Sequence, residues 1–197
     1  MAAEAAEDAA VALEHAVATS CEALTQTLDR DWTTTADDLT WSVRTTVEHT
    51  ASCLVGYAGQ VVGQPERGWV VPDVPLEPQM TSADAVAFLA ASGAILASVV
   101  RTTPPTARGF HPYGTSDPEG FACMGIVESL VHTHDVMATF GVPRQLPSAS
   151  AATALQRLFR DAPQGDPVDV LLWCCGRQPL DDLPRREKWR WDGTPLA

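Results

Sequence analysis

The sequence is poor in basic residues. It has 13 Lys and Arg against 25 Asp and Glu, which gives a formal net charge of -12. Binding to nucleic acids or to anionic membranes needs concentrated Lys and Arg, and here these residues are scattered along the chain. The composition therefore argues against both kinds of partner, and its simplest consequence is solubility.

The chain also lacks the features of an export signal and of a membrane span. Residues 1–8 are acidic, without the cationic and apolar regions of a signal peptide, so we expect no export and a cytoplasmic location. The longest uncharged stretches lie between Glu48 and Glu66 and between Asp84 and Arg101. Polar or small residues interrupt both, and they fall short of the roughly 20 apolar residues that cross a bilayer. We expect no membrane-spanning segment.

Cysteine is sparse and shows no recognisable pattern. The 5 cysteines include no CxxC pair; they are Cys21, Cys53, Cys123, Cys174 and Cys175. An odd, widely spread set indicates neither a disulfide framework nor a zinc finger, and it fits a reducing cytoplasm.

What is present is the composition of an ordinary globular domain. Hydrophobic residues make up 45% of the chain and charged residues 19%. A length of 197 residues fits one domain with a short appendage. Strand signals are nearly absent, apart from a possible short extended end at residues 189–193.

Apolar periodicity, caps and breakers predict four long helices and two short ones. The predicted ranges are about 5–28, 43–62 after Ser42, 82–101 after Thr81 or Ser82, 118–140 after Asp117, 149–161 and 167–175. Four prolines make residues 63–80 a long crossover. The simplest architecture is all-α, a four-helix bundle whose two long connections depart from a plain up-and-down order. We assign residues 1–145 to the bundle and residues 146–197 to a short helical C-terminal extension packed on it.

The fourth helix carries the chemistry. Between Phe121 and Pro143 it has no Lys or Arg. At about 100° per residue, Glu128, His132 and Asp135 fall within roughly 60° of one another on an otherwise apolar helix. Glu and His at i and i+4 can point at one metal ion, and a structural ion pair explains the same spacing equally well.

His49, on the second helix, is the candidate for a third ligand. It is turned away from the main apolar stripe of that helix, and small or polar neighbours suit a pocket wall there. A lone histidine is more often a hydrogen-bonded or surface residue than a metal ligand. Cys53, one turn later, is a possible fourth ligand, although we expect it to pack as a small, buried, apolar side chain. Asp135 either orients a ligand imidazole, meets substrate, or accepts a local hydrogen bond.

Two other histidines and the tryptophans can also be placed from the sequence. His15 and His111 are predicted to be surface or loop residues. The tryptophans predicted to lie in the core are Trp32, Trp41 and Trp173, and those predicted to edge a pocket are Trp69, Trp189 and Trp191.

Two segments together resemble a known family. Trp-Ser-Val-Arg at residues 41–44, with His49 after it, is followed about 80 residues later by Glu-Ser-Leu-Val-His-Thr-His-Asp at residues 128–135. This pattern resembles the DinB/YfiT-like metalloenzymes, and within them the actinobacterial proteins related to mycothiol-dependent maleylpyruvate isomerase. The resemblance covers about residues 8–145.

The resemblance implies a DinB-like bundle in which His49, Glu128 and His132 ligate a divalent ion, usually zinc. Asp135 matches the acidic residue that commonly follows, and mycothiol is implied as cosubstrate. Isomerases of this type carry a further C-terminal domain that contributes a basic residue to catalysis. This chain is too short to hold that domain in full, and Arg177 or the pair Arg185 and Arg186 is the candidate substitute.

Three hypotheses follow, and the first is preferred. Two imidazoles and one carboxylate leave a coordination position open, as in catalytic rather than structural zinc sites. The first hypothesis is a thiol (mycothiol)-dependent transferase or isomerase acting on a small electrophile, with Arg108, Arg177 or another cation holding an acidic substrate group. The second is a hydrolase that uses metal-activated water, with Asp135 as base. The third is a non-catalytic, metal-stabilised binding module. Nickel, iron or manganese can replace zinc in such a ligand set, and the protein is a monomer or a homodimer.

Overall fold

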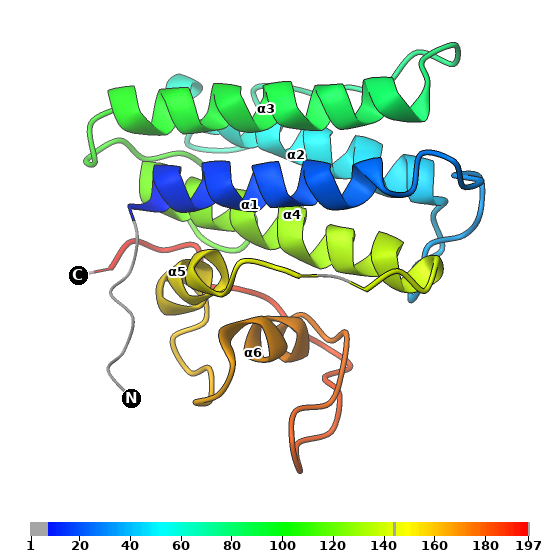
Figure 1. The fold of residues 1–197 in the computed structure, drawn as a ribbon. Coiled ribbons are helices and arrows are strands. Elements are labelled where there is room, and N and C mark those ends of the chain that lie inside the picture. The colour runs from blue at the N-terminus through cyan, green and yellow to red at the C-terminus, as the bar shows by residue number, and fades with distance from the viewer. Residues whose placement is uncertain (1–7, 144, 197) are drawn as a thin grey trace.

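The computed structural model describes residues 8–143 and 145–196, and within them the fold is all-helical (Figure 1). The six helices are α1 (Ala9–Thr25), α2 (Val43–Gly63), α3 (Ser82–Thr102), α4 (Pro118–Thr139), α5 (Ser148–Leu158) and α6 (Pro167–Cys174). The predicted fold class is confirmed. No strand occurs among the described residues, so the expected extended end at residues 189–193 is irregular backbone.

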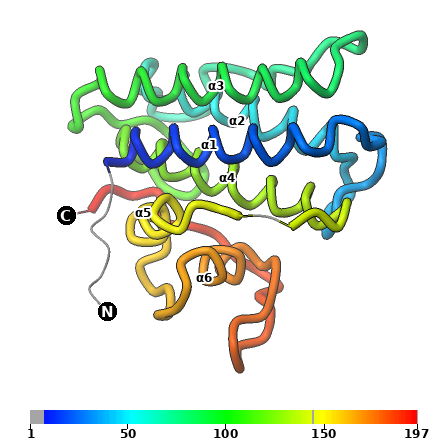
Figure 2. Tube along the Cα trace, in the orientation of Figure 1, coloured from blue at the N-terminus to red at the C-terminus, as the bar shows by residue number. Residues whose placement is uncertain are grey.

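The helices α1 to α4 form a bundle in which consecutive helices are not always neighbours. α1 and α2 each pack against α3 and α4, while in the described chain the backbones of α1 and α2 do not come close to each other. The segments 26–42 and 103–117 therefore link helices that lie diagonally across the bundle (Figure 2). This confirms the predicted departure from an up-and-down order. The proline-rich segment 64–81 is not a crossover, however, because it joins the neighbours α2 and α3.

Side-chain caps fix most helix starts where the sequence predicts them. Ser42 accepts a hydrogen bond from the Thr45 amide, and Thr81 forms a reciprocal capping box with Asp84. Asp117 caps α4, with Pro118 at the first helical position.

The first helix is shorter than predicted. It begins after Asp8, whose carboxylate accepts from the amides of Ala10 and Val11, and it ends at Thr25 because the chain then tightens into a turn. Residues 5–7 of the prediction lie outside the described residues.

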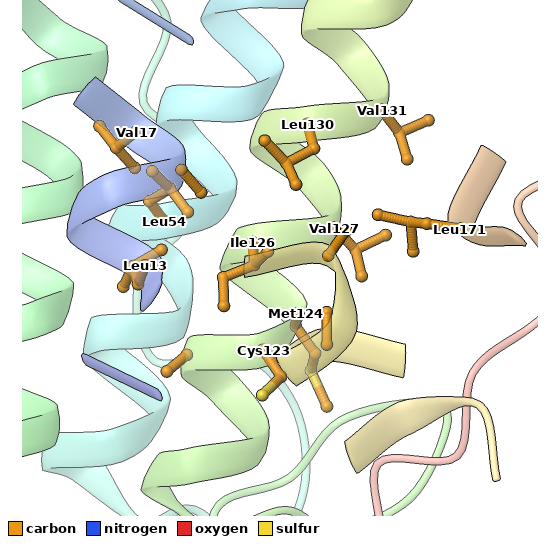
Figure 3. Close-up of a cluster of buried hydrophobic side chains, with 14 of the residues drawn as sticks. Leu13, Val17, Leu54, Cys123, Met124, Ile126, Val127, Leu130, Val131 and Leu171 are labelled. Carbon is orange, nitrogen blue, oxygen red and sulfur yellow. The ribbon is translucent and has the colours of Figure 1, made fainter. Parts of the chain in front are cut away.

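α4 is the central helix, buried on several sides. Figure 3 shows Ile126 and Leu130 facing Leu13 and Leu54 of α1 and α2, while Val127 and Val131 lie toward Leu171 of α6. A polar side chain on α4 therefore points into the molecule, where an unpaired charge would be costly.

α3 has the length and hydropathy of a membrane span. Its most apolar window has a mean hydropathy of 1.9, and 33% of that window is buried. In this fold α3 packs beside α1 and α2 as a bundle helix, and a core helix meets the same criteria of length and composition.

The C-terminal residues cover the side of α4 opposite α3. α5 packs on α4 and α1, and α6 packs on α5 and α4 (Figure 1). Arg157 on α5 is buried and donates to Asp117 at the start of α4 and to the carbonyl of Thr194 near the C-terminus. This side chain ties three segments of the chain together.

Candidate metal centre

The structure brings His49 of α2 next to Glu128 and His132 of α4. Glu128 Oε2 lies 3.3 Å from His132 Nε2 and 3.7 Å from His49 Nε2. The two imidazole rings meet edge to face, with centroids 5.4 Å apart. The three residues proposed as ligands, from two helices separated by about 80 residues of sequence, therefore converge on one point.

Cys53 joins this group. Its Sγ lies 3.4 Å from His49 Nε2, and the donor atoms of His49, Cys53 and Glu128 all fall within 4.8 Å of one another. Ligand atoms at zinc bond lengths of about 2.0–2.3 Å in a tetrahedron are separated by roughly 3.2–3.8 Å. The separations of Glu128 Oε2 from the two imidazole nitrogens and of Cys53 Sγ from His49 Nε2 fall in this range, so His49, Cys53 and Glu128 could hold a divalent ion, with His132 beside them.

Asp135 lies behind His132 and not in the cavity. Its Oδ2 accepts from His132 Nδ1 at 3.0 Å. Arg177, which follows α6, donates to both oxygens of Asp135, from Nε at 2.9 Å and from Nη2 at 2.8 Å. The carboxylate thereby holds the proton on Nδ1 of His132 and leaves Nε2 directed at Glu128, as the orienting role predicts.

The protonation states follow from these contacts. Burial alone would lower the pKa of His132, but its hydrogen bonds to Asp135 and Glu128 outweigh burial and raise it to about 9. Burial would raise the pKa of Glu128, yet the hydrogen bond and charge of His132 hold it below its ordinary value. Burial lowers the pKa of His49, so this imidazole is neutral at neutral pH. Glu128 and His132 thus form an ion pair, with a neutral imidazole beside them.

A cavity of about 460 Å³ opens from this cluster. Tyr57 borders both the cluster and the rest of the cavity, because its hydroxyl donates to Glu128 Oε1 at 3.0 Å while its ring packs against Trp69 and His111. Most of the lining is aromatic or aliphatic; the aromatic members besides Tyr57 are Trp41, Trp69, His111, Tyr113, Trp189 and Trp191.

The two arginines predicted to hold substrate are placed differently. Arg177 lines the cavity, with its guanidinium bonded to Asp135. Arg108 is exposed in the segment after α3, where it donates to the carbonyls of Pro105 and Ala107 and takes no part in the cavity lining. The structure does not bring Arg108 to the site.

Aromatic residues of the site correct one prediction and agree with two others. Trp41 is not in the core: it is 39% exposed and covers His49, with ring centroids 4.8 Å apart. His111 is in a loop as expected but is not on the surface, because only 7% of it is exposed. Trp69, Trp189 and Trp191 edge the cavity as predicted. The burial of His111 could not be predicted, because loop residues carry no periodic signal of burial.

Comparison with known proteins identifies the family of this chain. A family model described as the DinB superfamily matches residues 12–136, which is more than half of the chain. The chain belongs to the DinB superfamily. This superfamily includes metal-binding enzymes, and its match covers the bundle that carries His49, Glu128 and His132. No curated protein and no solved structure gave a significant match to the chain.

Proposed function

We propose that this DinB superfamily member is a metal-dependent transferase or isomerase that uses a low-molecular-weight thiol, mycothiol in the first instance, against a small electrophile. The observation that supports the proposal is the convergence of two imidazoles and one carboxylate on the wall of a cavity. A divalent ion held by these residues, zinc being the first candidate, would lower the pKa of a thiol and supply a thiolate at neutral pH.

The surrounding residues support thiol chemistry over hydrolysis with Asp135 as base. Both carboxylate oxygens of Asp135 are engaged by Arg177 and His132, and the group is 1% exposed. It is therefore a positioning residue for His132 and has no free oxygen to take a proton from water in the cavity. Among the described residues, Arg177 is the only arginine in the cavity lining, and its guanidinium is already bonded to Asp135.

The first experiment asks whether the three residues bind a metal. Elemental analysis of the purified protein should find one divalent ion per chain. The ion should be absent from His49→Ala and retained by His15→Ala, which changes an exposed histidine of α1. Equal metal content in all three proteins would remove the proposed site.

The second experiment asks which nucleophile is used. The metal-loaded protein is incubated with mycothiol and 1-chloro-2,4-dinitrobenzene, and the thioether product is followed by absorbance and mass spectrometry. We expect product formation that requires both metal and thiol and that is lost in His49→Ala. Turnover of electrophilic esters or amides without thiol, together with no thioether, would replace this proposal by a hydrolase.

Cys53 favours a second candidate, a metal-stabilised binding module. If its sulfur is a fourth ligand, the coordination shell is closed, as in structural zinc sites. Cobalt substitution separates the two functions, since a thiolate ligand gives a near-ultraviolet charge-transfer band. A band lost in Cys53→Ser but kept in Cys21→Ser, with unfolding on chelation, would favour the binding module. Its absence, with the fold kept after chelation, favours the enzyme.

A further inference from the structure

The end of the cavity away from the metal residues is built around His111, which is held on a braced turn. Gly109 and Ser116 exchange two backbone hydrogen bonds of 2.9 Å, and the Gly114 amide closes the turn onto the His111 carbonyl at 3.0 Å. Gly114 has a φ of 112°, a conformation that suits glycine. Backbone hydrogen bonds before and after His111 therefore fix the part of the chain that carries the imidazole.

Gln60 of α2 joins this turn to the segment that carries Trp69. Its buried amide donates to the carbonyls of Gly68 and Phe110 at 3.0 and 2.7 Å, and it accepts from the Val70 amide at 2.9 Å. One side chain of the bundle thus positions both an aromatic wall and the histidine beside it, which is the support a preorganised binding site needs.

The hydrogen bonds of His111 decide which nitrogen carries its proton. The Tyr113 backbone amide donates to Nδ1 at 3.1 Å, so Nδ1 is an acceptor and the neutral ring carries its hydrogen on Nε2. Burial lowers the pKa of His111 to about 4, which keeps the ring neutral at neutral pH. Nε2 has no hydrogen-bond partner within the described chain, and it is not sealed from solvent. The residue is 7% exposed and lines the cavity, so this unused N–H is available to a molecule bound there.

Aromatic rings surround this donor. Ring centroids lie within 5.4–6.4 Å of His111 for Tyr57, Trp69, Tyr113, Phe121 and Trp191. The charged side chains of the cavity lining, Glu128, His132 and Arg177, all lie at the other end of the cavity, around the candidate metal residues. The His111 end therefore offers flat aromatic walls and the His111 N–H as a directional hydrogen-bond donor, which suits an uncharged ring with an acceptor atom.

We propose that this end of the cavity binds a planar, conjugated, uncharged part of the substrate, and that His111 Nε2 donates a hydrogen bond to an acceptor atom on it. The proposal names a substrate class for the cavity and so rests on the proposed function. Binding at this end does not itself require a metal, and it can be tested on metal-free protein.

The test uses two probes of equal shape, isoquinoline and naphthalene, of which only isoquinoline has an acceptor atom. Binding to the full-length metal-free protein is measured by calorimetry or saturation-transfer NMR at mildly alkaline pH, where isoquinoline is uncharged. Because a net hydrogen bond is worth about 1 kcal/mol, we expect isoquinoline to bind about fivefold more tightly. His111→Phe keeps the aromatic wall and should abolish the preference, while His15→Phe should keep it.

Trp69→Ala provides an independent test, because it removes part of the aromatic wall and leaves the His111 donor in place. It should weaken both probes by a similar factor, because the aromatic wall serves both. Equal affinity of the wild-type protein for the two probes would overturn the proposal. So would a preference that survives in His111→Phe, or binding of both probes that is unchanged in Trp69→Ala. A missing metal in elemental analysis would sink the proposed function alone, since these probes are measured without metal.

Discussion

At the scale of single residues, the charge on Asp135 matters most because a buried guanidinium depends on it. Asp135 is 1% exposed, and the Arg177 side chain is 9% exposed. Asp135→Asn keeps the size of the side chain and removes the charge. We expect a loss of about 3 kcal/mol in the free energy of unfolding, measured with urea, because Arg177 is left buried without a counter-charge. Zinc affinity should fall by roughly 10- to 100-fold as His132 loses its orienting partner.

The control for this change is Asp38→Asn, which removes the same charge from an exposed pair with Arg185. Those two side chains are 32% and 45% exposed, and a surface ion pair contributes about 1 kcal/mol or less. A stability loss in Asp135→Asn no larger than in Asp38→Asn would show that the buried pair does not hold the site together.

His111 gives a prediction about pH. Its folded pKa of about 4 lies below the unfolded value of about 6.5, so between these values the unfolded chain binds a proton that the folded protein does not. Its contribution to stability is present above about pH 6.5 and is lost as the pH falls toward 4. The loss is on the order of 3 kcal/mol. Urea unfolding across this window should therefore show a weaker pH dependence for His111→Phe than for wild type. An unchanged slope in His111→Phe, equal to that of His15→Phe, would mean that the ring is not buried neutral.

At the scale of helices, the close contact between α1 and α3 depends on Gly93, because glycine has no side chain. A Cβ on Gly93 would lie 2.8 Å from both methyl groups of Val17, whose branched side chain has little rotamer freedom. A Cβ on Gly56 would meet the Trp69 ring at an ordinary 3.8 Å. We expect Gly93→Ala to destabilise the protein by about 1 kcal/mol, since overpacking exceeds the gain in helix propensity.

Gly56→Ala is the matched substitution in a helix, and it should stabilise the protein by up to about 1 kcal/mol. Both variants are compared with wild type by urea unfolding. Equal stabilisation by the two alanines would show that α1 can move away from α3 without cost.

The helices, and the stripe that carries Glu128 and His132, could be predicted from sequence because their signals are local. Caps such as Ser42 and Asp117 mark helix starts, and the i, i+4 spacing places Glu128 and His132 on one stripe. The position of His111 could not be predicted in this way. It depends on Gln60 and on contacts with Trp191, which are far apart in sequence. Loop residues have no period that would reveal such contacts.

At the scale of the whole molecule, the C-terminal residues complete the site as well as the fold. The family match ends at residue 136, yet Arg177 and two of the cavity tryptophans lie beyond it. Residues 146–197 could be assigned to an extension from the sequence, but the bond from Arg177 to Asp135 could not be predicted, because it joins α4 to a residue after α6 that is distant in sequence. The candidate metal residues therefore depend on packing outside the region that the family model matches.

This dependence predicts that the bundle and the extension unfold together. α5 and α6 cover α4, so opening them would expose its apolar side chains. Native-state hydrogen exchange in mild urea should give peptides from α4 and α5 the same opening free energy. Arg157→Met should uncouple them, because Arg157 is 2% exposed and joins α5 to Asp117 and to the C-terminal segment. Arg160→Met, which changes a 41% exposed arginine of the same region, should not. If α5 already opens well before α4 in the wild-type protein, the extension is a separate unit and Arg177 cannot hold Asp135 through the lifetime of the folded bundle.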